Sequence, residues 1–286
     1  MKKIILSGSI SLLILSCSSD NNTVTDNTDP TQQNVILPVK MSIDGETMKI
    51  NYDGTKITNL ISTSNSGNKL VFEYNGDLIS SIKFYEGNVL QTAQEYTYNS
   101  NNLLAKAVNK EYASNGITIQ YSTTNTYTHI NSNSITVKRE MYSPTPQPVM
   151  NTTYTYNNGN IVGSTGSGSL TYNGVTTNYN ESSTYTFTDK NYPFKNVKGF
   201  DKLVHTDDRG DGLSFLFSNI KNNISSYKST TSWTSPSGTG TSFSSYKYTT
   251  TFNTAGYPIY ESRNSLDANG NPDMSQPEIH TYEYNH

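Results

Sequence analysis

The sequence EYTYNSNNLLAKAV, residues 95–108, decides the fold. Tyr96 and Tyr98 alternate with polar residues, a polar run follows, and Leu103 and Ala105 begin an apolar return. Alternation with a period of two predicts a half-buried β-strand, and a short polar break between two such runs predicts a hairpin turn. The stretch therefore predicts a strand, a turn and a second strand, in which Leu103, Ala105 and Ala107 are the apolar positions.

The same pattern recurs along most of the chain, and successive copies are 22 to 35 residues apart. The last aromatic residue or histidine before each turn is Tyr52, Tyr74, Tyr98, His129, Tyr156, Phe187, Phe217, Phe252 or Tyr284. At about 3.3 Å per residue, this spacing accommodates two strands and their turns. We therefore expect eight hairpins and a final strand, seventeen strands in all, in one repetitive domain over residues 39–286.

The alternation also predicts which face of each strand is buried. Between Ile117 and Ile130, odd positions carry most of the large side chains and even positions carry mostly Thr, Ser and Gln. Asn-Gly pairs such as Asn158–Gly159 and Asn173–Gly174 are strong hairpin signals. The fold class predicted is all-β: an antiparallel up-and-down meander, closed or strongly curved into a barrel, with aromatic residues inside. Closure removes the exposed edge strands, and the polar outer face argues against insertion into a bilayer.

The first residues predict export and lipidation. Lys2 and Lys3 precede a short apolar run that is broken by serines and is too short to span a membrane comfortably. LILSC at residues 13–17 resembles the lipobox of bacterial lipoproteins, which implies a signal peptide over residues 1–16 and a lipid on Cys17. Cys17 is also the only cysteine, so no intramolecular disulfide can form.

Residues 17–38 then form a flexible tether, because a polar segment with so few aliphatic residues cannot bury enough surface to order itself. Ser18 after the cysteine suggests the outer membrane, by analogy with lipoprotein sorting. The sequence leaves open whether the protein faces the cell surface or the periplasm. The membrane is thus one expected partner, reached through the lipid anchor.

The repeats themselves carry a second resemblance. Units such as Tyr154–Thr–Tyr156–Asn157 followed by Ile161 resemble the YD (Rhs-type) repeats of secreted bacterial proteins. Together with the lipobox, they resemble Bacteroidetes-type lipoproteins of unknown function with a porin-like β fold. This resemblance implies a fold and no activity.

Composition limits the possible partners. The formal net charge is −3 and charged residues make up only 15% of the chain, so there is no basic field to attract nucleic acid. Tyrosine is abundant, with 22 residues against a single Trp233. These rings offer stacking surfaces for a glycan, a small molecule or a protein ligand.

Two acidic clusters are candidate sites. His205, Asp207, Asp208 and Asp211 form the most densely charged segment, and we consider them as a ligand loop or metal loop against the alternative of a solvated connection. Asp267, Asn269, Asn271 and Asp273 place oxygen side chains at alternate positions around Gly270, as short calcium loops do. The same letters also make an ordinary hairpin turn. No cofactor is expected beyond this possible calcium ion.

No catalytic motif is present: there is no HExxH, no Gly-rich phosphate loop and no nucleophile elbow. The first functional hypothesis is therefore an outer-membrane-anchored, non-enzymatic surface binding or scaffold module. The second is a carrier or glycan-binding protein that uses a Tyr-lined cavity or groove, with Trp233 as a candidate contact. A hydrolase would require the carboxylates or His205 to converge in a cleft.

Overall fold

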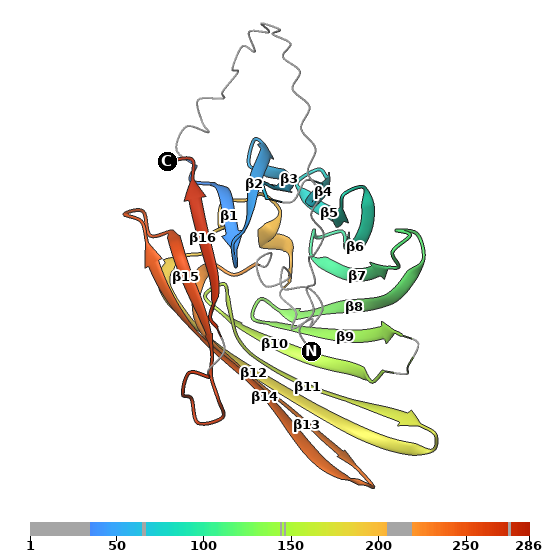
Figure 1. Cartoon of the computed structure of the whole chain (residues 1–286). Coiled ribbons are helices and arrows are strands. Elements are labelled where there is room, and N and C mark those ends of the chain that lie inside the picture. Colours follow the sequence, from blue (N-terminus) through green and yellow to red (C-terminus); the bar gives the residue numbers. More distant parts are fainter. Residues whose placement is uncertain (1–34, 65–66, 144, 146, 205–218, 274–275) are drawn as a thin grey trace, which may run out of the picture. The chain divides into compact units, whose positions relative to one another are not determined.

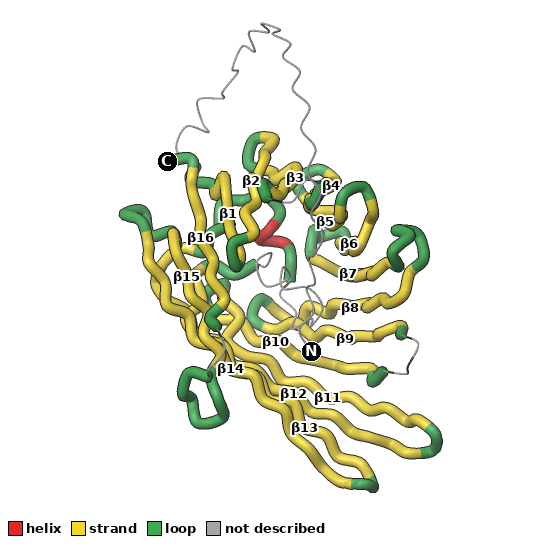
Figure 2. The backbone as a smooth tube through the Cα atoms, in the orientation of Figure 1, coloured by secondary structure: helices red, strands yellow, loops and turns green. Residues whose placement is uncertain are grey.

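The chain forms a sixteen-stranded antiparallel β-barrel (Figures 1 and 2). The computed structural model describes residues 35–64, 67–143, 145, 147–204, 219–273 and 276–286, and Val35–His286 is one compact unit. The strands are β1 (Pro38–Ile43), β2 (Glu46–Asp53), β3 (Lys56–Ser62), β4 (Lys69–Asn75), β5 (Leu78–Glu86), β6 (Val89–Tyr98), β7 (Leu104–Tyr112), β8 (Ile119–Asn131), β9 (Ser134–Tyr142), β10 (Val149–Asn157), β11 (Asn160–Tyr172), β12 (Val175–Asn191), β13 (Asn222–Ser235), β14 (Gly238–Phe252), β15 (Pro258–Ser265) and β16 (Glu278–Tyr284).

Each strand pairs with the next, and β1 pairs antiparallel with β16 to close the barrel. The all-β meander and its closure are thus confirmed, but the expected number of seventeen strands is wrong. The pattern overlooked β1, and it counted a strand after Phe187 and a strand ending at Phe217. Phe187 lies within β12, the described residues 192–204 form no strand, and residues 205–218 lie outside the described residues. A wholly antiparallel barrel needs an even number of strands, because first and last must run in opposite directions to pair.

Many aromatic rings face the interior, as the alternation predicts, although Tyr121, Tyr142 and Tyr260 are exposed. On β10, Tyr154 and Tyr156 are buried, while Thr155 between them is exposed. On β7 the apolar positions expected from the sequence are buried only in part: Ala107 is buried, but Leu103 is exposed and Leu104 is buried in its place at 1% exposure. The cause is an irregularity in the register between Thr97 and Tyr98, which makes Leu104 the cross-strand partner of Tyr98.

The same kind of register irregularity recurs at one end of the barrel, where it accompanies a repeated side-chain hydrogen bond. Just before their turns, Tyr52, Tyr74 and Tyr98 pair across a register shift with an Ile or Leu on the next strand. The hydroxyl of Tyr98 then donates to the carbonyl oxygen of Ile79, the partner of Tyr74, at 2.9 Å. Each pre-turn residue that makes such a bond therefore ties its own hairpin to the hairpin before it.

The same arrangement extends around this end of the barrel. His129 Nε2 contacts Leu104 O at 2.8 Å, Tyr284 donates to Pro258 O at 2.9 Å, and Tyr52 donates to Pro38 O at 2.7 Å. We call the end that carries these contacts the latched end. The Tyr52 bond joins β2 to Pro38 of β1, and Pro38 in turn pairs with Tyr284 across the seam between β1 and β16.

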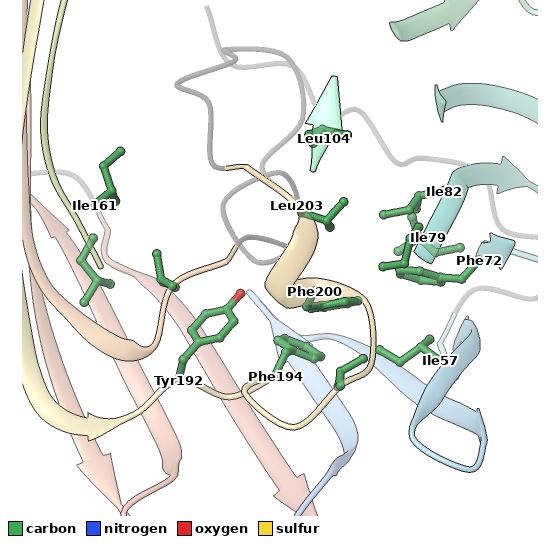
Figure 3. Packing of buried hydrophobic residues seen from close by; sticks show 14 of the residues in the cluster. Ile57, Phe72, Ile79, Ile82, Leu104, Ile161, Tyr192, Phe194, Phe200 and Leu203 are labelled. Atoms are coloured by element: carbon green, nitrogen blue, oxygen red, sulfur yellow. The ribbon is translucent and has the colours of Figure 1, made fainter. Parts of the chain in front are cut away.

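Residues 192–204, between β12 and β13, turn into the latched end and fill it (Figure 3). Phe194, Phe200 and Leu203 are at most 2% exposed, and the Phe200 ring lies 5.6 Å from Phe194 and 6.1 Å from Phe72 between ring centroids. We call residues 192–204 the inserted segment. Its one short 3-10 helix, η2 (Phe200–Lys202), is the only helix in the described part of the chain, where no helix is long and apolar enough to cross a membrane.

The opposite end is made by β11 to β14, four consecutive long strands of 13 to 17 residues each. Asn173 and Gly174 join β11 to β12 with positive φ angles of 50° and 77°, as an Asn-Gly hairpin turn requires. We call this end, which carries the turns at residues 173–174 and 236–237, the long-strand end (Figure 2).

Candidate functional site on the inner wall of the barrel

Several residues singled out from the sequence lie outside the described residues. They are Cys17, His205, Asp207, Asp208 and Asp211. The lipid anchor and the acidic ligand loop therefore stay predictions.

Trp233 lies on the inner wall near the long-strand end. It pairs with Tyr179 on β12 and with Gly240 on β14, and its side chain alternates on the same face as half-buried Tyr227. A Cβ atom at Gly240 would lie 2.4 Å from the indole ring, so the ring extends over the bare backbone of that glycine. Trp233 nevertheless keeps 39% of its surface exposed, which leaves the indole accessible to a ligand.

A second glycine, Gly166, makes room for an ion pair on the adjoining part of the inner wall. Gly166 on β11 lies between Thr152 and Glu181, and Thr152 Oγ1 donates a short hydrogen bond to Glu181 Oε1 across it. Arg139 on β9 reaches the other carboxylate oxygen of Glu181, with Nη2 and Oε2 3.3 Å apart. Arg139 and Glu181 thus interact across two intervening strands, because Thr152 and Gly166 present little bulk beneath them.

The Arg139–Glu181 ion pair is held in place by its neighbours but is not completely buried. The side chains of Arg139 and Glu181 are 19% and 12% exposed, so both charges are largely removed from water while an edge stays accessible. Tyr179 is two residues from Glu181 on the same face of β12, beside Trp233. We call Trp233, Tyr179, Arg139 and Glu181 the inner-wall site. It combines two aromatic faces with a held charge pair, which suits a polar ligand that also has a flat apolar face.

A second polar cluster is formed by β15 and β16. His280 lies between Glu278, at 2.6 Å from Nε2, and Glu261, at 3.4 Å from Nδ1. Arg263 forms a short ion pair with Glu278, and Asn223 donates to Glu261 Oε2 at 2.9 Å. His280 and Glu261 are only 4% and 5% exposed.

Burial lowers the pKa of His280, but the two carboxylates outweigh this effect and raise it to about 9. Burial likewise raises the pKa of Glu278, but the hydrogen bond from His280 and the charge of Arg263 hold it below its usual value. At neutral pH the positive charges of His280 and Arg263 therefore lie beside the negative charge of Glu278. Each acidic or basic side chain of the cluster already has a partner within the chain, which is typical of a structural role in the barrel wall.

Only part of this cluster could be read from the sequence. His280 lies on the buried face of β16, two residues before buried Tyr282. The pairs Glu261–x–Arg263 and Glu278–x–His280 did carry a signal, since charged residues at alternate positions share one face of a strand. That the two pairs would lie opposite each other depends on the β15–β16 register, which the sequence does not show.

The Asp267 segment forms a turn between β15 and β16. Asp267 Oδ1 accepts hydrogen bonds from the backbone N–H groups of Asn269 and Asn271, each at 2.9 Å. These bonds hold the Asp267 pKa below its usual value. Glu278, twelfth in the proposed calcium loop, contacts Arg263 and His280 instead. No group of three His, Cys, Asp or Glu suited to a metal occurs among the described residues. Calcium binding by Asp267, Asn269, Asn271 and Asp273 stays a prediction.

The fold is similar to that of solved porin-like proteins. A porin-like protein from Bacteroides vulgatus ATCC 8482 matches with a TM-score of 0.51 at 11% sequence identity, covering 87% of this chain and 99% of that one. A porin-like protein from Bacteroides uniformis ATCC 8492 matches with a TM-score of 0.45 at 13% identity, covering 86% and 96%. No family model and no curated protein matches the sequence. The chain is therefore a β-barrel protein with a porin-like fold.

Proposed function

We propose that this chain is a non-enzymatic binding module, anchored to the outer membrane by a lipid on Cys17, that recognises a ligand through the inner-wall site. The observation that carries the proposal is the accessible indole of Trp233, held over Gly240 beside Tyr179. A large ring that stays exposed over a glycine is energetically unfavourable in the absence of a ligand, because its apolar face remains in contact with water.

The position of the site agrees with a tethered protein. The described chain starts at Val35, whose carbonyl oxygen accepts from Asn285 Nδ2 at the latched end. Trp233 is two residues from the end of β13, at the long-strand end. A tether that joins the barrel at Val35 therefore enters opposite the exposed ring.

The outer face supports a barrel that stands outside the bilayer. Pairs such as Lys83–Glu73 and Lys110–Glu95 cross neighbouring strands on this face, with Nζ–Oε1 distances of 2.6 Å. Charged side chains toward lipid cost about 2–4 kcal/mol each for Lys at the membrane midplane. A lipid on the N-terminal cysteine supplies the membrane attachment without insertion of the barrel.

The filled latched end favours the scaffold role as a second candidate. The inserted segment contributes Phe194 and Phe200 to a continuous core, so this part of the interior has no room for cargo. A scaffold would use the rigid barrel alone, whereas a carrier or glycan-binding protein would need the inner-wall site. The two candidates therefore differ in whether Trp233 contacts a ligand.

Trp233 provides a direct test because it is the only tryptophan in the chain. We expect its fluorescence to shift when ligands with a flat apolar face and polar groups, such as oligosaccharides and amino sugars, are titrated against the purified protein. Calorimetry on Trp233→Ala should then show at least tenfold weaker binding, and Tyr172→Ala, an exposed tyrosine at the β11–β12 turn, should bind as the wild type does. Equal affinity of Trp233→Ala and the wild type would refute the inner-wall site.

The anchor is tested separately. Cys17→Ala should release the protein from the membrane fraction of fractionated cells. Continued membrane association of this variant would contradict the lipid anchor and leave the ligand test unaffected.

A further inference from the structure

An open depression of about 510 Å³ lies on the outside of the barrel, on β10, β11 and β12. It is lined by Val149, Asn151, Ser167, Gly168, Ser169, Asn178, Tyr179 and Asn180. This volume is within the usual range for small-molecule sites, about 300–1,000 Å³. None of the lining residues is charged.

The strand register explains how its polar side chains gather there. Asn151 pairs with Ser167, and Ser167 pairs with Asn180 on the next strand. Ser169 and Asn178 form the neighbouring pair. These five residues are exposed and alternate with inward-facing Thr152 and Glu181, so their side chains form one contiguous patch on the outer face. We call them the outer Asn/Ser patch.

No structural role within the chain explains why the three asparagines of this patch lie in β-strands. Asparagine is depleted in β-strands and is favoured in turns, where its side chain bonds the backbone. Asn99 and Asn253 do this: each side-chain oxygen accepts two backbone N–H groups of its turn. Among the described residues, by contrast, the side chains of Asn151, Asn178 and Asn180 have no hydrogen-bond partner in the chain.

The charges around the patch narrow the class of ligand. The cross-strand neighbour of Asn151 on β9 is Lys138, and its ammonium group already contacts Glu140 at 2.9 Å. The patch itself offers amides that both donate and accept, together with hydroxyls that do the same. This chemistry complements vicinal hydroxyl groups and gives no advantage to an ion.

We propose that the outer Asn/Ser patch is a binding site for a neutral oligosaccharide. The ligand lies along the depression across β10, β11 and β12, and its hydroxyl groups bond the amides of Asn151, Asn178 and Asn180. The site is on the opposite face of the sheet from Trp233, so the proposal does not depend on the inner-wall site.

The experiment titrates the purified protein with neutral hexasaccharides of glucose, xylose, mannose and galactose and follows binding by calorimetry. At least one should bind, and the double variant Asn178→Ala/Asn180→Ala should weaken its affinity at least tenfold. Thr241→Ala is the matched control, because Thr241 is an exposed residue on the same polar face two strands from β12. Affinity within twofold of wild type is expected for it.

A second variant separates this site from the inner-wall site. In a Trp233→Ala background, Asn178→Ala/Asn180→Ala should still weaken hexasaccharide binding at least tenfold, because the indole faces the interior and the asparagines face outward. Binding that is lost in Trp233→Ala but kept in Asn178→Ala/Asn180→Ala would overturn the outer site and support the inner one. Absence of binding to all four hexasaccharides at millimolar concentration would also overturn the outer site. Circular dichroism of the variants checks that each one is folded.

Discussion

The two ends of the barrel interior are built from different side chains and have different tasks. At the latched end, tyrosines, aliphatic residues and the inserted segment form a continuous core, with Phe194, Ile57 and Leu60 fully buried. Toward the long-strand end the inner wall carries Gly166, Gly168 and the Arg139–Glu181 pair in place of such a core. The comparison indicates that the latched end supplies stability and leaves the long strands free to carry polar surfaces that add little to it.

The largest effect should come from emptying the latched end. Phe194→Ala leaves a cavity in the centre of the core and should lower the free energy of unfolding by about 3–5 kcal/mol. Trp233→Ala, the matching aromatic substitution on the inner wall, should cost about 1 kcal/mol or less because its ring is already partly exposed. Urea denaturation of both variants measures the difference, and equal losses would show that the two ends share the stability.

A smaller effect should follow from pH, through the cluster of Glu261, Arg263, Glu278 and His280. The folded state raises the His280 pKa from 6.5 to about 9, so it binds the proton more tightly than the unfolded chain does. The contribution is therefore complete below about pH 6.5 and is lost as the pH rises through 9, on the order of 3 kcal/mol.

Urea denaturation at pH 6.5 and pH 9.5 measures this contribution. His280→Gln should lack the part of the decrease that the wild type shows between these pH values, whereas His129→Gln, at the latched end, should retain it. A wild type whose stability is the same at both pH values would contradict the protonated cluster.

The smallest effect should come from a single latch. Tyr98→Phe removes the hydroxyl that donates to Ile79 O and should lower the free energy of unfolding by about 1 kcal/mol. Tyr172→Phe, at the exposed β11–β12 turn, should leave it unchanged within about 0.5 kcal/mol. If both variants have wild-type stability, the pre-turn hydroxyl groups do not tie the hairpins together.

The candidate sites could be anticipated only in part. Trp233 was singled out as a large ring in a polar chain, but its support by Gly240 and its place beside Tyr179 depend on the register of three strands. Asn178 and Asn180 are visible in the sequence as asparagines within a strand. Their gathering with Asn151 needs two hairpin registers, and a shift of one residue would turn each side chain to the other face.

The sequence by itself determined the local structure, because alternation of period two and Asn-Gly turns act over a few residues. It therefore predicted the strands, the inward tyrosines of β10 and the antiparallel meander. Only the tertiary structure decided the sixteen-strand closure through β1, the buried side of β7 and the turning of Phe194 and Phe200 into the core. These features depend on contacts between residues far apart in the chain, such as Pro38 with Tyr284 at the seam and Phe200 with Phe72, and no local pattern encodes such contacts.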